Sequence, residues 1–125
     1  LVAGAGRVYV VHLDGRVLRL DADGHTLARG QANVFSTMGI AWDHLRQRVY
    51  VGSREGRIVA LNASTLREVA HFDLPGPAYA LTVNPGTGRI FAVDAANDQL
   101  YIVEPDGSGI GQIGLPAQDA RDGGQ

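Results

Sequence analysis

The chain has 125 residues, with 11 Lys and Arg against 13 Asp and Glu, so its formal net charge is −2. A weakly acidic chain is a poor general binder of nucleic acid or of anionic membranes. The chain contains no cysteine, which excludes disulfides, thiolate catalysis and zinc sites built on cysteine. An apolar content of 45% excludes an intrinsically disordered chain. The apolar runs are about four to five residues long, too short to span a bilayer.

An internal repeat is the main feature of the sequence. Three segments of the type Arg-Val-Tyr-Val begin at Arg7, Arg48 and Arg89, and each lies 41 positions after the one before it. A turn and a second apolar run follow each segment. The third unit carries one extra residue in this turn, within 95–98. Repetition at this period indicates an array of equivalent structural units.

Each unit contains short runs rich in Val, Ile, Leu and Tyr, which favour strands over helices. Dipeptides such as Asp14-Gly15 and Glu55-Gly56 predict hairpin turns between runs, because glycine adopts positive φ without strain. Only Leu1-Val2 remains of a first run in the first unit. In chain order, the predicted strands are 7–10, 17–20, 26–28, 39–42, 48–51, 58–61, 68–74, 79–83, 89–92, 100–103 and 110–115.

Four-stranded units of about 40 residues are typical of β-propeller blades. The sequence therefore predicts an all-β fold: a single partial β-propeller of three four-stranded antiparallel blades. The expected blades are about 1–37, lacking most of its inner strand, about 38–77 and about 78–116, followed by a tail at 117–125.

The segments 48–62 and 81–94 resemble repeats of the YVTN family, whose WD40-like propellers include lactonase-like and surface-layer-associated proteins. The second unit is also similar to quinoprotein-type repeats, although it lacks their usual closing Gly and Trp. The YVTN resemblance implies a bacterial, extracytoplasmic protein.

Three blades do not close a ring, since propellers use roughly four to eight. The sequence also begins without methionine, so we expect a fragment of a larger propeller. The partners are then the remaining blades of a longer chain; identical chains that complete the ring are the alternative. A protein or small-molecule ligand is also possible, whereas nucleic acid and a membrane span are not expected.

The resemblance implies a ligand at one mouth of the central channel, where the turns between second and third strands meet the loops that join blades. Those loops contribute Phe35, Thr37 and Met38, among others. A metal or acid–base cluster of oxygen ligands would suit Ca²⁺ or Mg²⁺ there, but Asp and Asn are also common turn formers. The candidate ligand-binding residues are His12, Asp14, Arg54, Glu55, Asp94, Asn97 and Asp98.

No strong catalytic or metal motif accompanies these residues. The four histidines lack zinc-ligand spacing, and Asp21-Ala22-Asp23-Gly24 is expected to be a plain turn rather than a calcium loop. A triad of Ser53, His12 and Asp94 lacks the Gly-x-Ser-x-Gly elbow.

Two other features favour structure over function. The arginines that open the second run of each unit are expected to make equivalent contacts between blades. Trp42 is expected to pack in the core. The sequence thus favours a non-catalytic binding or interaction scaffold with no assigned cofactor. The alternative is a lactonase-like hydrolase or a quinoprotein-like oxidoreductase with its site at the channel.

Overall fold

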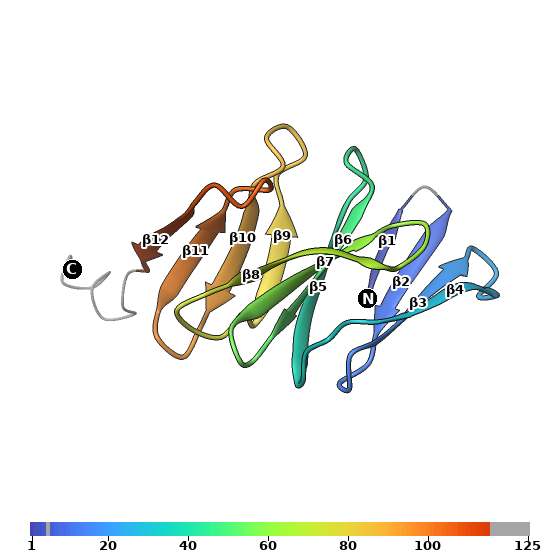
Figure 1. Cartoon of the computed structure of the whole chain (residues 1–125), viewed down its shortest axis with the longest axis horizontal. Coiled ribbons are helices and arrows are strands. Elements are labelled where there is room, and N and C mark those ends of the chain that lie inside the picture. The colour runs from blue at the N-terminus through green and yellow to red at the C-terminus, as the bar shows by residue number, and fades with distance from the viewer. Residues whose placement is uncertain (5, 116–125) are drawn as a thin grey trace, which may run out of the picture.

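The computed structural model describes residues 1–4 and 6–115. In this part of the chain, every regular element is a β-strand, and three four-stranded antiparallel sheets follow one another along the long axis of the molecule (Figure 1). The first sheet comprises β1 (Val2–Gly4), β2 (Arg7–Val11), β3 (Arg16–Asp21) and β4 (Thr26–Gln31). The second comprises β5 (Thr37–Asp43), β6 (Arg48–Ser53), β7 (Arg57–Asn62) and β8 (Glu68–Asp73). The third comprises β9 (Ala80–Val83), β10 (Ile90–Asp94), β11 (Gln99–Val103) and β12 (Ile110–Gly114).

Within each sheet, the strands are adjacent in sequence order, as the repeat predicted. The inner strands β1, β5 and β9 lie next to one another, so that the sheets fan out from a common inner side. The sequence left Leu1-Val2 as the remainder of the first inner strand. The structure has a short β1 of 3 residues there, paired with β2 through Val2↔Tyr9 and Gly4↔Arg7.

The core consists of two apolar layers between the sheets. One layer joins the first and second sheets and includes Tyr9, Val17, Val49 and Val59. The other joins the second and third sheets and includes Tyr50, Ile58, Ile90 and Tyr101. The middle strands of the second sheet are therefore buried on both faces, which explains why β6 and β7 are almost continuously apolar.

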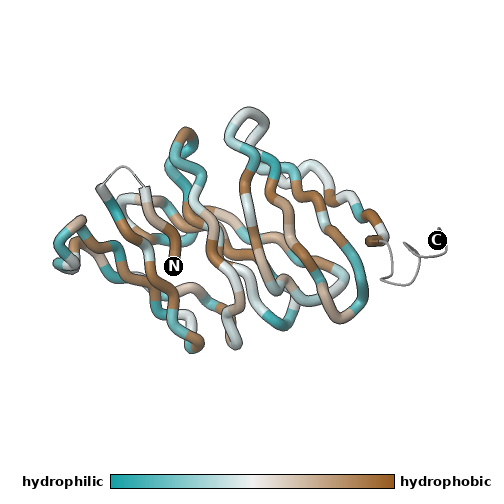
Figure 2. The backbone as a smooth tube through the Cα atoms, turned by 180° about the vertical axis from the view of Figure 1, so that it is seen from behind, coloured by the Kyte–Doolittle hydropathy of each residue, from teal (hydrophilic) through white to brown (hydrophobic). Residues whose placement is uncertain are grey.

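Hydrophobic residues are frequent along the strands of both end sheets (Figure 2). Four partly exposed side chains of the first sheet occupy the positions of buried residues in the second sheet: Val8, Val10, Leu18 and Leu20 correspond to Val49, Val51, Val59 and Leu61. On the third sheet, the same holds for Phe91, Val93, Leu100 and Ile102. Both outer faces thus have the composition of a sheet interface.

The turns after β2, β6 and β10 differ as the sequence predicted. The first two contain glycine with positive φ, Gly15 at 91° and Gly56 at 92°. The third is one residue longer, since the pair Val93↔Leu100 encloses six residues, whereas the equivalent pairs Val11↔Val17 and Gly52↔Ile58 each enclose five. In the third turn, Asp98 takes a positive φ of 53°. In the described residues, there is no helix long and apolar enough to cross a membrane.

Candidate functional site at the mouth face

One end of the fan is formed by the turns after β2, β6 and β10 and by the loops that join the sheets, β4–β5 and β8–β9. We call this end the mouth face. Backbone hydrogen bonds hold the turns and loops together. Arg54 N donates to Ser36 O at 3.0 Å, Ala78 N to Ser53 O at 3.0 Å, and Tyr79 N to Val93 O at 2.9 Å. The convergence that the resemblance implied is therefore present in the described residues.

Asp94 ends β10 and lies inside the mouth face rather than on it, with 0% of its surface exposed. Its carboxylate accepts hydrogen bonds from Asn97 Nδ2 at 2.7 Å, Tyr101 Oη at 2.9 Å and the Asn97 backbone N–H at 3.2 Å. Burial alone would raise the pKa of Asp94, but these donors outweigh it and hold the pKa below its ordinary value of 3.8. Burial and the bond to Asp94 raise the pKa of Tyr101.

Gly76, in the β8–β9 loop, closes this carboxylate off. A Cβ atom at Gly76 would lie 2.6 Å from Tyr101 Oη and closer still to Asp94 Oδ2, so only glycine brings the loop this near. The Asp94–Asn97–Tyr101 group thus braces the turn after β10 beneath the β8–β9 loop. In this arrangement, the oxygens of Asp94 are used within the protein.

The other candidate residues are spread over the three turns. His12 and Arg54 are exposed. Asp14 forms an ion pair with Arg16 at 2.8 Å, and hydrogen bonds from Arg16 hold its pKa below 3.8. Glu55 Oε1 accepts from Phe35 N at 3.0 Å, which ties the β4–β5 loop to the turn after β6. Asp98 is exposed.

Within the described residues, these side chains form no metal-ligating group or triad. Ser53 Oγ is engaged with the backbone of Arg57, donating to its carbonyl at 3.1 Å and accepting from its N–H at 3.2 Å. The described residues place one set of three potential metal ligands together, and that set lies at the other end of the fan: Asp21, Asp23 and His25.

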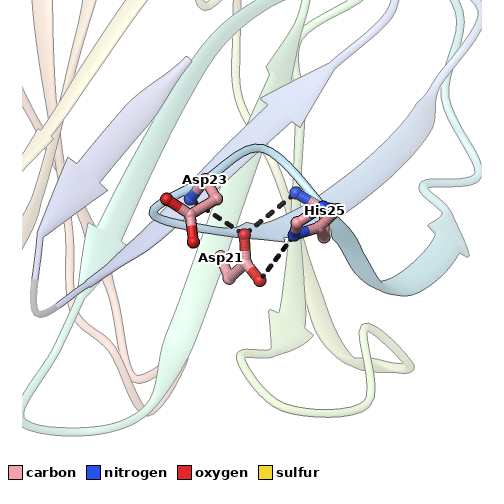
Figure 3. Close-up of side chains that lie close together, drawn as sticks. All are labelled: Asp21, Asp23 and His25. Carbon is pink, nitrogen blue, oxygen red and sulfur yellow. Dashed lines mark hydrogen bonds and ion pairs between the residues drawn. The ribbon is translucent and has the colours of Figure 1, made fainter.

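This set is a turn, as the sequence indicated (Figure 3). Asp21 Oδ1 accepts from the backbone N–H groups of Asp23 and His25, each at 2.9 Å. In the second sheet, Asn62 does the same for Ser64 at 2.8 Å and Thr65 at 3.0 Å, with no comparable set of ligands. Capping the turn therefore accounts for Asp21 without a metal ion.

The mouth face also carries a cleft of about 350 Å³, where β1, β5 and β9 approach one another, lined by both polar groups and large apolar side chains. Around it, Leu13 is 75% exposed and Met38 is 38% exposed. Phe35, in the loop leading into β5, is 76% exposed. The sequence pattern placed Leu13 and Phe35 correctly in a turn and a loop, whereas Met38, expected in the same loop as Phe35, lies in β5. Polar turn residues were favoured as candidates because exposure is not readable from loop composition. The cleft is lined by Leu1, Val11, Leu13, Met38, Ile40 and Leu81, among others.

The expectation that the repeated arginines make contacts between sheets is met in one unit. Arg48 Nη1 donates to Pro105 O of the third sheet at 3.3 Å. Arg89 Nε instead pairs with Glu104 of its own sheet at 2.8 Å, and Arg7 donates to the neighbouring Gly6 O at 3.1 Å. The three positions are equivalent in the strands but not in their partners, so the prediction of equivalent contacts between blades is wrong.

Trp42 packs against the core between the first and second sheets, as expected. Its ring meets Tyr9 edge-on with centroids 4.9 Å apart. Tyr9 also links the two sheets directly, since its hydroxyl donates to Ala63 O at 2.7 Å.

No protein-family model matches this sequence, and no curated protein matches it. Solved structures do. The β-propeller domain of Cps50 (Swd1) from Myceliophteria thermophila superposes with a TM-score of 0.72 at 12% identity, over 94% of this chain and 38% of that one. BamB from Moraxella catarrhalis gives 0.76 at 18% identity, over 95% and 38%. The WD40 repeats of RRP9 give 0.76 at 11% identity, over 90% and 36%.

The fold is that of β-propeller blades. At these identities, the similarity concerns the fold alone, and the resemblance to YVTN repeats stays a prediction. The chain spans less than two fifths of the length of each of the three similar structures. Its three sheets correspond to part of a propeller, and further blades are needed to complete a ring.

Proposed function

We propose that this chain is a non-catalytic binding scaffold, and that it binds a partner through apolar side chains at the mouth face of a propeller. The observation that carries the proposal is the cleft near Leu13 and Met38, with Phe35 exposed on the same face. Large apolar side chains exposed together on a soluble protein mark interaction sites. The loops that carry them are held by hydrogen bonds such as Phe35 N to Glu55, which lowers the entropy lost on binding.

Peptide selection tests this proposal. A phage-displayed peptide library is selected on the purified chain, and the selected peptides are then measured against Phe35→Ser and Leu13→Ser. Val69→Ser is the matched control, because Val69 is 48% exposed but lies on the outer strand β8. We expect each mouth variant to weaken binding about tenfold or more, as for a residue central to an interface. Peptides that bind all three variants equally well would refute the assignment of the mouth face.

The enzyme alternative is tested separately. A lactonase-like hydrolase would hydrolyse sugar lactones or aryl esters, and a quinoprotein-like oxidoreductase would carry a quinone chromophore. We expect hydrolysis at the buffer rate and no chromophore in the native protein. Hydrolysis well above background that disappears in Asp94→Ala would overturn the non-catalytic assignment.

We propose further that the complete ring belongs to a bacterial extracytoplasmic protein and takes its other blades from a longer chain, with identical chains as the alternative. The apolar outer faces of the first and third sheets support additional blades. The cellular setting rests on the resemblance to YVTN repeats. The mass of the chain in solution by light scattering distinguishes the two sources, since a dimer of the 13.2 kDa chain would favour identical chains. Recovery of the native protein from the cytoplasmic fraction would contradict the setting.

A further inference from the structure

A second surface lies at the end of the fan opposite the mouth face. The turn between β5 and β6, residues 44–47, projects there between two hollows. It is held firmly: Asp43 is buried and accepts from Arg46 N at 3.0 Å, and Gln47 Nε2 donates to His44 O at 2.6 Å. The equivalent turn of the third sheet reads Pro85-Gly86-Thr87-Gly88, with no large side chain. The side chains of residues 44–47 are thus a departure from the repeat.

The first hollow is aromatic and apolar. It has a volume of about 360 Å³ and is lined by Val2, Ala3, Gly4, Trp42 and His44. The Trp42 and His44 rings meet edge-on, with centroids 5.3 Å apart. The backbone at Gly4 approaches the indole so closely that a Cβ there would lie 3.3 Å from Trp42 Cζ3. No charged side chain lines this hollow, so it suits an apolar group.

The second hollow has two basic side chains, Arg46 and Arg48, against one acidic side chain, Asp106, in its lining. It has a volume of about 380 Å³ and is lined by Arg46, Arg48, Pro105 and Asp106. Asp43 pairs with Arg46 at 3.3 Å, but no ion pair of the described residues includes Arg48. Arg48 is held toward this hollow by its bond to Pro105 O.

The buried hydroxyl of Tyr50 also bears on how Arg48 is placed. Tyr50 is 0% exposed, and its Oη has no hydrogen-bond partner among the described residues. The equivalent Tyr9 donates to Ala63 O of the next sheet. At the second junction, the corresponding carbonyl, Pro105 O, accepts from Arg48 instead. Arg48 thus replaces the tyrosine as the link between sheets and brings a positive charge to the hollow.

Leu45, on the turn between the hollows, is 70% exposed. Leu45 and Arg46 on the turn, together with Trp42 at the end of β5 and Arg48 at the start of β6, have the composition of a protein-binding hot spot. We propose that this surface docks an acidic peptide segment of a partner protein, with an apolar side chain in the Trp42 hollow and a carboxylate at Arg48 and Arg46. The surface lies over the second sheet, both of whose neighbours are in the described structure. It is separate from the mouth face, so the two proposals stand or fall independently.

The only tryptophan of the chain lies in the first hollow, so its fluorescence reports occupancy directly. The probe is the tryptophan-free peptide acetyl-Phe-Gly-Glu-Glu-amide, titrated into the whole chain. Two comparison peptides carry Lys in place of both Glu, or Ala in place of Phe. We expect a saturable change in Trp42 emission with the first peptide and binding at least about tenfold weaker with the other two.

Variants separate the role of each hollow. Arg48→Gln is expected to weaken the acidic peptide about tenfold and to leave the lysine peptide unaffected. Arg29→Gln is the matched control, since Arg29 is exposed on the outer strand β4. An absent or non-saturable response to the acidic peptide would overturn the proposal. Equal responses to the acidic and basic peptides would also overturn it, and this comparison on the unaltered chain holds even if a variant fails to fold.

Discussion

Two tyrosines at equivalent positions give a sharp test of how the sheets are linked. Tyr9 and Tyr50 are 41 residues apart, both are buried, and each lies at a junction between sheets. The Tyr9 hydroxyl donates to Ala63 O at 2.7 Å, whereas the Tyr50 hydroxyl has no partner among the described residues. The substitutions Tyr9→Phe and Tyr50→Phe remove the same atom from two different environments.

The expected free-energy changes differ in size. Tyr9→Phe deletes a hydrogen bond and leaves the buried carbonyl of Ala63 unpaired, which costs about 1–3 kcal/mol. Tyr50→Phe removes a buried hydroxyl that makes no hydrogen bond within the described residues and has the Arg48 side chain as its polar neighbour, so its effect is expected to be near zero. A domain of this size shifts its midpoint temperature by roughly 3–5 °C per kcal/mol. Tyr9→Phe should therefore melt at least about 3 °C below Tyr50→Phe.

Urea unfolding followed by Trp42 fluorescence measures both variants against the parent chain, and thermal unfolding by circular dichroism provides the independent check. The slope of the unfolding free energy against urea concentration should be the same for both variants and the parent chain, so that differences in the urea midpoint report differences in stability. Equal losses in the two variants would refute the reasoning, because they would mean that the Tyr50 hydroxyl has a partner or that the Tyr9 bond contributes nothing.

Three further perturbations probe other parts of the molecule. The folded-state pKa of Asp94 lies below its ordinary value of 3.8. The ionised carboxylate therefore stabilises the fold above pH 3.8, and this stabilisation is lost as the pH falls through the folded-state pKa. Asp94→Asn should lower the urea midpoint at about pH 7, and the variant should lose less stability than the parent chain on acidification. Gly76→Ala should cost about 1–3 kcal/mol by overpacking, whereas Gly109→Ala, with no atom within 4 Å of the added Cβ, should stay within about 0.5 kcal/mol in the same assay. Val51→Ala should cost roughly 2 kcal/mol of stability in the isolated chain. The equivalent Val10→Ala, on the partly exposed outer face of the first sheet, should cost less than half of that. Equal costs would show that another blade covers this outer face in solution.

The fold was predictable because the features that determine it recur in all three units. Apolar runs at equivalent positions and glycine in the turns fix strands and hairpins locally. Even the extra residue at 95–98 was visible, since it shifts the later apolar run by one position. The short β1 was harder to predict, because Ala3-Gly4 lacks the β-branched and aromatic residues that distinguish a strand and is recruited by pairing with β2.

The candidate site was less predictable, for a physical reason. Sequence placed both Asp94 and Asn97 in the turn after the strand 89–92, whereas the structure extends this strand to Asp94. The sequence could not show that the Asp94 carboxylate faces inward. That orientation depends on Tyr101, seven residues later and on the next strand, and on Gly76, from a loop of the preceding unit. Contacts between units leave no trace in the local pattern of either segment.

The repeat itself indicates where specificity lies. Positions that agree among the three units maintain the sheets, as Val8, Val49 and Ile90 do in the strands. Positions that differ are free of that role or have exchanged it for another, and some of them lie at the two ends of the fan. At the end of the second strand, the three units place a histidine, a serine and an aspartate. On the opposite face, His44, Leu45 and Arg46 replace the small turn residues of the third unit, and this departure is the physical reason to seek a binding partner there.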